Sequence, residues 1–326
     1  MQITERRSVQ NEFGGIYKHI EHKQWSCIEC GCTNTAINSH LLQRNGILNY
    51  VAENGKLVMI KLKSIYAIRK GETPVTFQKI GIKEALSYDI FCSHHDVNLF
   101  KEIEDGLVDY TNYRHCALFY YRTLCAETRL KEIERERFKS LLNSETLAEF
   151  APEQMMSYLY DQSMTLELGV MDLTAYRSWI YNDLHNNTES FVFESFEIPI
   201  KGIFASAISN MFLTEKDIMS PDFAKLLFIQ IIPQKENSRI MFGYNKQYHY
   251  EDYITYIERW RNAKKENLGY MLTGILIQLQ NWGMSPSLYE KLPPQNIAKY
   301  YYLFMQDYMS PNQYPNESFN LFEGVF

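Results

Sequence analysis

Two short clusters of cysteine and histidine near the start of the chain carry the side chains best suited to chemistry. The first is Cys27-Ile28-Glu29-Cys30, and the second is Cys92-Ser93-His94-His95-Asp96. Two pairs of soft ligands, each spaced by two residues, can close a tetrahedron around one zinc ion. The pattern therefore predicts a structural zinc bound by three thiolates and one imidazole, with the ligands Cys27, Cys30, Cys92 and His95.

Neighbouring side chains leave alternatives to this ligand set. His94 competes with His95 for the fourth position, and His95 is favoured because it repeats the two-residue spacing of the first pair. Cys32 is also close, but its spacing from Cys30 is unusual for a zinc-binding turn. The alternative to a zinc site is a set of ordinary buried cysteines beside a surface histidine. His40, ten residues after Cys30, is not one of the four predicted zinc ligands and is available for another role.

From Trp25 to Glu104 the chain resembles a zinc-braced HNH nuclease module of the His-Me finger group. The shared pattern is a C-x-x-C pair, a histidine about ten residues later, and an aromatic-Cys-x-x-Cys/His motif at the start of a helix. The matching segments are Cys27–Cys30, Ile37–His40 and Ile90–Asp96. The sequence also resembles poorly described bacterial proteins in which C-x-x-C…SH is followed by FC-x-x-HD-x-x-LF. Those proteins are suspected of taking part in defence against phage.

The resemblance implies a role for each of two residues. His40 would be the general base that takes a proton from water. Asp96 stands where the family usually has a metal-binding histidine, and a carboxylate there suits Mg²⁺ or Mn²⁺ beside the scissile phosphate. The implied activity is metal-dependent hydrolysis of DNA, or less directly of RNA.

Several positions depart from the family pattern. Ser39 stands where the family often has an acidic residue, and Ser87–Asp89 stand where it has an asparagine. Asn98 or Asp89 could substitute, and residues 54–80 form an insertion. A second hypothesis therefore stays open, in which the chain is a non-catalytic, zinc-stabilised interaction or sensor protein with a degenerate HNH site.

Length and composition predict sizeable cores in two domains or one large one, because 45% of the 326 residues are apolar. The six cysteines lack an even, secreted-type spacing, which favours a reducing compartment. Residues 1–10 contain no apolar signal core. The most apolar stretch, Leu268–Leu279, falls short of the roughly 20 residues that cross a bilayer. We therefore expect a soluble, cytoplasmic protein that does not bind membranes.

Charge is spread unevenly along the chain. Residues 1–96 contain 12 Lys/Arg and 9 Asp/Glu, whereas the whole chain has a net charge of −6. The front of the chain is therefore the part suited to a polyanion such as nucleic acid. The excess is small, and most of these charges are expected to lie on a solvated face.

The predicted fold class is α+β, with a zinc-bearing, ββα-metal-like module over residues 1–110, a helical region over 111–190 and a mixed α/β recognition domain over 191–326. The last region shows no catalytic signature and is expected to bind a partner, which could be a protein. Asn54-Gly55 predicts a hairpin turn. Apolar patterning predicts strands over Ala36–His40, Leu57–Leu62, Val75–Ile80, Phe191–Ile198, Lys225–Ile232 and Arg239–Tyr244. It predicts helices over Arg114–Leu142, Pro152–Tyr160, Leu166–His185, Tyr250–Lys265, Leu268–Trp282 and Pro294–Met309.

Overall fold

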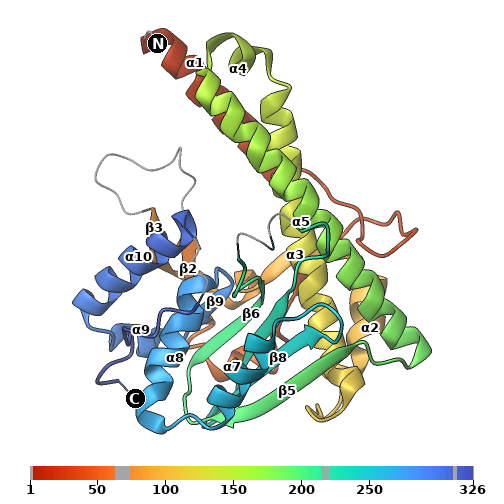
Figure 1. Cartoon of the computed structure of the whole chain (residues 1–326), viewed down its shortest axis with the longest axis vertical. Coiled ribbons are helices and arrows are strands. Elements are labelled where there is room, and N and C mark those ends of the chain that lie inside the picture. The colour runs from red at the N-terminus through yellow and green to blue at the C-terminus, as the bar shows by residue number, and fades with distance from the viewer. Residues whose placement is uncertain (1–2, 63–73, 215–216, 218–219, 311–313, 326) are drawn as a thin grey trace.

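The structure, a computed structural model, describes residues 3–62, 74–214, 217, 220–310 and 314–325. It has the predicted α+β class (Figure 1). The helices are α1 (Ile3–Glu21), α2 (Ser93–Glu104), α3 (Tyr113–Leu142), α4 (Glu145–Phe150), α5 (Glu153–Asn186), α7 (Glu251–Arg261), α8 (Lys265–Gln278), α9 (Pro286–Glu290) and α10 (Pro294–Met309). The strands are β1 (Ile37–His40), β2 (Lys56–Leu62), β3 (Val75–Gly81), β4 (Ser87–Phe91), β5 (Phe191–Ile198), β6 (Ile203–Ser209), β7 (Leu227–Pro233), β8 (Ser238–Asn245) and β9 (Trp282–Met284).

One antiparallel sheet forms the body of the molecule, with strand order β3-β2-β9-β6-β7-β8-β5. Strands β2 and β3 belong to residues 54–80, the segment that the sequence analysis treats as an insertion. They join the C-terminal strands because β9 pairs with β2 on one side and with β6 on the other. The predicted boundary at residue 110 therefore divides residues that share a single sheet.

Close packing at the centre of this sheet requires a glycine. A Cβ atom on Gly283 in β9 would lie 2.4 Å from the carbonyl oxygen of Val58 and 2.5 Å from the ring of Phe204. These two residues belong to the strands on either side, β2 and β6. The absence of a side chain at Gly283 is thus what allows three strands from distant parts of the chain to pack together.

Helices cover both faces of the sheet. Side chains of α7, α8 and α10 pack with Ile229 and Ile231 of β7 in one core, whereas α3 and α5 pack with Phe228 of the same strand in a second core. Alternate residues of a strand point to opposite faces, so β7 is buried throughout, and apolar except at Gln230, because both of its faces are covered. The second core is also the one that contains Cys27 and Cys92.

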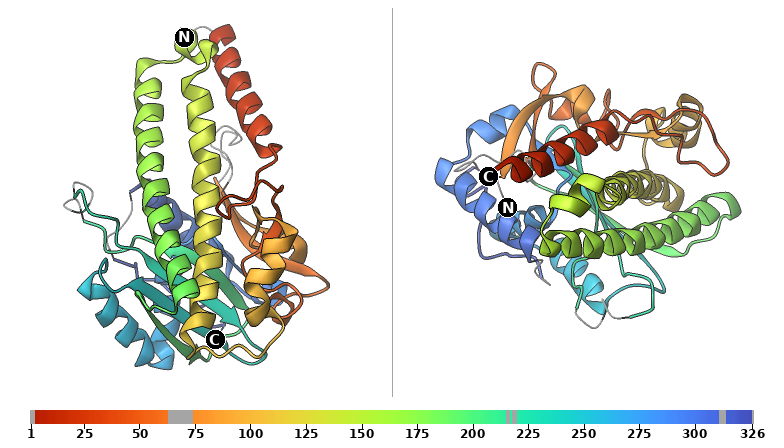
Figure 2. Two further views of the ribbon diagram at one scale, coloured as in Figure 1. Left: turned by 90° about the vertical axis from the view of Figure 1, so that its right-hand side faces the viewer. Right: turned by 90° about the horizontal axis from the view of Figure 1, so that it is seen from above.

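A long helical projection extends from the body. In Figures 1 and 2, α1 runs beside the C-terminal half of α3 and the N-terminal half of α5, with α4 at the tip. A separate small core holds the tip together, made of Val9, Phe13, Leu141, Leu147 and Leu159. α5 is one continuous helix, whereas the sequence analysis predicts two helices over this range.

The local turn at Asn54-Gly55 is confirmed. Both residues have positive φ, 51° and 68°, and Glu53 and Lys56 form a bridge across the turn. The arm before the turn contains a short 3₁₀ helix, Leu48–Tyr50. A second 3₁₀ turn, Ile82–Glu84, follows β3 and precedes β4.

Candidate metal centre and the His40 site

A hairpin, a two-stranded sheet and a helix bring the cysteine and histidine clusters together. The backbone NH of Cys27 donates to the carbonyl of Asn34 at 2.7 Å, which closes the hairpin. The NH of Ile28 donates to Ile90 of β4 at 2.9 Å, which ties the hairpin to the second cluster. Strand β4 pairs antiparallel with β1, and Cys92 then caps the start of α2. Two strands followed by a helix is the arrangement implied by the resemblance described above.

Four side chains converge in this unit and can hold a metal ion. The ligand atoms of Cys27, Cys32, Cys92 and His95 lie within 4.8 Å of one another. The Nδ1 atom of His95 is 3.3 Å from the sulfur of Cys27 and 3.4 Å from that of Cys92. The sulfurs of Cys32 and Cys92 are 3.9 Å apart. Zinc–ligand bonds of about 2.3 Å to sulfur and about 2.1 Å to nitrogen give tetrahedral edges of about 3.8 and 3.6 Å, so these separations fit a Cys₃His zinc site.

The fourth ligand atom comes from Cys32, in the place predicted for Cys30. The NH of Cys32 donates to the carbonyl of Glu29 at 3.0 Å, and Gly31 has φ of 73°, which defines a tight turn. Cys30 lies at the outer corner of this turn and is exposed, whereas Cys32 returns toward the cluster. The two-residue spacing therefore selected a different second cysteine from the one that the structure brings to the cluster. The tight turn spans Glu29–Cys32, two residues later than the Cys27–Cys30 turn that a C-x-x-C pair would form.

The second cluster supplies the histidine that the spacing favoured. His95 lies in the group of four, whereas the side chain of His94 points to Asn98, whose amide lies 3.1 Å from its Nδ1. Asn98 also donates to the backbone carbonyl of His94 at 2.8 Å. Asn98 is thereby held on the outer side of α2, where it does not replace the family's asparagine as a metal ligand.

The electrostatic environments of the two buried cysteines differ. The backbone NH of His95, at the start of α2, lowers the pKa of Cys92 to about 6. Burial raises the pKa of Cys27 to about 11. The start of α2 thus favours the thiolate form of Cys92, and a bound cation would supply the charge needed to ionise Cys27.

His40 lies at the end of β1, a short distance along the chain from the metal centre. Its imidazole is half-buried and hydrogen bonds to the backbone of Ile82, while its Nε2 atom is buried without a partner among the described residues. Burial lowers the pKa of His40 below its ordinary value of 6.5, so the ring is neutral near pH 7. A neutral imidazole with one oriented nitrogen and one free nitrogen can accept a proton.

Asp96 follows the metal ligand His95 in the first turn of α2. Burial raises the pKa of its carboxyl, while Arg122 and a hydrogen bond from Ser39 oppose that rise. Its Oδ1 atom is buried and has no hydrogen-bond partner in the part of the chain that the structure describes. His40 and Asp96 also act on each other electrostatically. The two residues singled out by the resemblance therefore occupy one neighbourhood, and each leaves a buried polar atom unpaired.

Arg122 of α3 is a third member of this neighbourhood, and it had no sequence signal. Its side chain is 1% exposed, and it pairs with Glu104 at 2.6 Å. The guanidinium carbon lies 3.8 Å from the centre of the Phe100 ring, and Nε has no hydrogen-bond partner among the described residues. A charged residue within an otherwise apolar helical segment is the one hint that the sequence offered.

The positions that depart from the family pattern do not add metal ligands beside His40. Ser39 is fully buried, and its hydroxyl oxygen accepts from the NH of Phe91. Asp89 is exposed on β4. Within the described ranges, the Cys/His group is the one cluster of at least three metal-type side chains.

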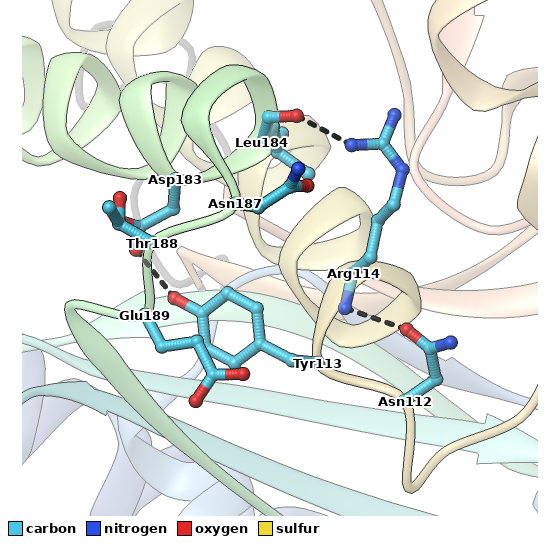
Figure 3. A pocket seen from close by; sticks show the side chains of 8 residues that line it. All are labelled: Asn112, Tyr113, Arg114, Asp183, Leu184, Asn187, Thr188 and Glu189. Atoms are coloured by element: carbon cyan, nitrogen blue, oxygen red, sulfur yellow. Dashed lines mark hydrogen bonds between the residues drawn. The ribbon is translucent and has the colours of Figure 1, made fainter.

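A separate cavity of about 330 Å³ lies where α3 begins and α5 ends (Figure 3). Several of its polar side chains bond to the two helix ends. Tyr113 donates to Asp183 at 2.5 Å, Thr188 donates to the same carboxylate, and Arg114 donates to the backbone of Leu184. These contacts join the two helix ends, so the cavity is a structural junction.

Comparison of the chain with protein-family models, curated proteins and solved structures finds no match. Among the described residues, none of the helices combines the length and apolar character needed to span a membrane.

Proposed function

We propose that the chain hydrolyses phosphodiester bonds of nucleic acid, with His40 as the general base and Asp96 as the ligand of a divalent cation. The observation that carries this proposal is the pair of buried, unpaired polar atoms, Nε2 of His40 and Oδ1 of Asp96. Leaving such atoms unpaired is unfavourable, so a cation or substrate that pairs with both would be bound favourably.

The surrounding geometry supports the chemistry. The bond to Ile82 orients the imidazole, and burial holds it in the neutral form that a general base needs. Water would add to phosphorus as the bond to the leaving oxygen breaks, and Nε2 would take the proton of that water. Mg²⁺ or Mn²⁺ on Asp96 would offset negative charge on the phosphate. Zinc in the Cys₃His group would fix α2 against the Cys27–Cys32 turn, which leads into β1, and thereby help to fix Asp96 relative to His40.

DNA is the favoured substrate, on the resemblance to HNH nucleases. A role in defence against phage is part of the same proposal and rests on the second resemblance alone.

The test compares the full chain with His40→Ala and Asp96→Asn on plasmid DNA in the presence of Mg²⁺ or Mn²⁺. We expect cleavage by the wild type and a loss of about 10²- to 10⁴-fold in each variant, the range of one general base. His19→Ala is the matched control, because His19 is an exposed histidine on α1. Zinc content and thermal midpoint are measured on every variant, so that loss of folding is recognised. Equal rates for the wild type and His40→Ala would contradict the proposal.

A non-catalytic interaction protein is the second candidate, and an exposed apolar stripe favours it. Tyr160, Met164, Leu168 and Met171 are each at least 50% exposed. Their spacing of four, four and three residues places them on one face of α5, along the helical projection. Absence of cleavage by the wild type with every divalent cation tried, in a folded and zinc-loaded protein, would favour this candidate.

A further inference from the structure

A second cavity, of about 360 Å³, adjoins the metal centre. It lies between the Lys23–Ile28 segment and helices α3 and α5. Its walls include three basic residues, Lys23, Arg129 and Arg177, and one acidic residue, Glu132. Lys23 pairs with Glu136 at 2.7 Å and Arg129 pairs with Glu132 at 3.2 Å, so the charge left to attract an anion is that of Arg177.

Arg129 gives the cavity a hydrogen-bond donor that is held in a fixed position. Its side chain is 4% exposed, and its guanidinium donates to the carbonyl of Ser26 at 2.6 Å and pairs with Glu132 at 3.2 Å. These two contacts hold the group in place. Its Nε atom is buried and has no hydrogen-bond partner within the described part of the chain.

Arg177 adds a second guanidinium from α5. Among the described residues it forms no ion pair within 4.0 Å. Burial is the largest cause of the lowered pKa of Arg129; Glu132 opposes this, and the charge of Arg177 adds to it. Two like charges that face one cavity destabilise each other, and one carboxylate, Glu132, cannot neutralise both. A bound phosphate would relieve that repulsion and accept hydrogen bonds from both groups.

Trp25 provides an aromatic wall beside these cations. The Nζ atom of Lys23 is 4.6 Å from the centre of its ring, and the guanidinium carbon of Arg129 is 4.9 Å away. An aromatic ring next to basic side chains is the combination that binds single-stranded nucleic acid, because the ring stacks on a base while the cations contact the phosphate.

We propose that this cavity binds one nucleotide unit of the substrate strand, with its phosphate against Arg129 and Arg177 and its base against Trp25. The proposal rests on the proposed nuclease function and names where the strand is held. Cys27 lines the cavity, and its sulfur is 3.3 Å from Nδ1 of His95, which precedes Asp96. The strand would thus be held beside the Cys/His group, by helices that lie outside the ββα unit.

The experiment measures binding of a fluorescent single-stranded DNA 12-mer to the full chain by anisotropy, without added Mg²⁺ or Mn²⁺. The background variant is His40→Ala, so cleavage does not interfere. Arg177→Gln should weaken binding about tenfold, the effect of losing one charge-assisted contact. Glu132→Gln should tighten binding, because it removes the carboxylate that competes with the phosphate. Lys201→Gln is the control, because Lys201 is a surface lysine that pairs with Glu236.

Salt dependence supplies a readout that a structural change would not move. For single strands, loss of one phosphate contact lowers the slope of log K against log salt by about 0.7. Arg177→Gln should show this drop, and Lys201→Gln should not. Adenosine monophosphate and inorganic phosphate, added as competitors, distinguish a strand from a free nucleotide. Displacement at equal nucleotide concentration would assign the cavity to free nucleotides and overturn the strand proposal.

Binding that is the same for the wild type, Arg177→Gln and Glu132→Gln would also overturn the proposal. The proposed catalytic function would survive that result if His40→Ala still abolished cleavage. Conversely, the opposite effects of Arg177→Gln and Glu132→Gln on binding would support the cavity even if the wild type cut no DNA.

Discussion

The metal centre gives the sharpest prediction, because the structure and the sequence spacing choose different cysteines. Cys32→Ser removes a sulfur that lies 3.9 Å from that of Cys92, close to the tetrahedral edge of a zinc–thiolate site. Cys30→Ser changes an exposed side chain two residues earlier on the same turn. The two substitutions are chemically identical and nearly adjacent, so each controls for the other.

The expected difference is large. Loss of residues that merely orient a zinc ligand lowers affinity by about 10- to 100-fold. Loss of the ligand itself should exceed that, so we expect Cys32→Ser to weaken zinc binding by at least about 100-fold, or about 2.7 kcal/mol. Cys30→Ser should stay within about 0.5 kcal/mol of the wild type, as most surface substitutions do. Because zinc binding stabilises the folded state, the thermal midpoint should fall with Cys32→Ser and not with Cys30→Ser.

Zinc content is measured by elemental analysis, and affinity is measured by competition with a chromophoric chelator at fixed pH. Cys27→Ser serves as the positive control, since both the spacing and the structure make Cys27 a ligand. A full equivalent of tightly bound zinc in Cys32→Ser, together with its loss in Cys30→Ser, would refute the assignment and restore the C-x-x-C pair. Retention of zinc in all three variants would refute the site itself.

Three further predictions concern His40, the sheet and the helical projection. The pKa of His40 is lowered by burial below 6.5, so the unfolded state binds more protons once the pH falls below 6.5 and stability is lost there. Urea unfolding should therefore show His40→Gln losing less stability than the wild type between about pH 7 and about pH 5, and equal losses would contradict the burial of a neutral imidazole. Gly283→Ala should lower the free energy of unfolding by about 2 to 4 kcal/mol in the same assay, because its Cβ would lie 2.4 Å from a neighbouring carbonyl oxygen. A neutral effect would argue against the placement of β9 between β2 and β6. Gly14→Ala is its matched control on α1, where a Cβ has no atom within 4 Å, and it should stabilise by about 0.5 to 1 kcal/mol; destabilisation would contradict an open helical position.

Short-range patterns predicted much of the secondary structure. β5 and α10 have the predicted bounds, and the Asn54-Gly55 turn has positive φ at both residues. In each case the deciding information lies within a few residues, as alternation of apolar side chains or the chemistry of a turn. The helix α1 carries similar information in the apolar spacing of Val9 and Phe13 and could have been predicted.

Pairing between distant segments had no comparable signal. Residues 54–80 were interpreted as an insertion into the metal-binding module, but β2 joins β9, more than two hundred residues later in the chain. Trp282, the first residue of the three-residue strand β9, was predicted as the end of a helix, because Leu268–Trp282 is apolar without a clear strand period. The choice of Cys32 likewise depends on where a turn closes, which Gly31 determines and cysteine spacing does not.

The helix α3 links these observations, because it serves both candidate sites. Arg122 and Arg129 are seven residues apart, so they lie two turns apart on one face of that helix. Arg122 reaches the neighbourhood of His40 and Asp96, and Arg129 reaches the cavity beside Trp25. Just before Arg122, Tyr121 donates to the buried carboxylate of Glu29 at 2.5 Å, in the turn that carries Cys32. Residues 1–110 hold the metal ligands and the imidazole, but the charges that would meet a phosphate come from the helices beyond them. A division of the chain at residue 110 would therefore separate the groups proposed to activate water from the groups proposed to hold the phosphate.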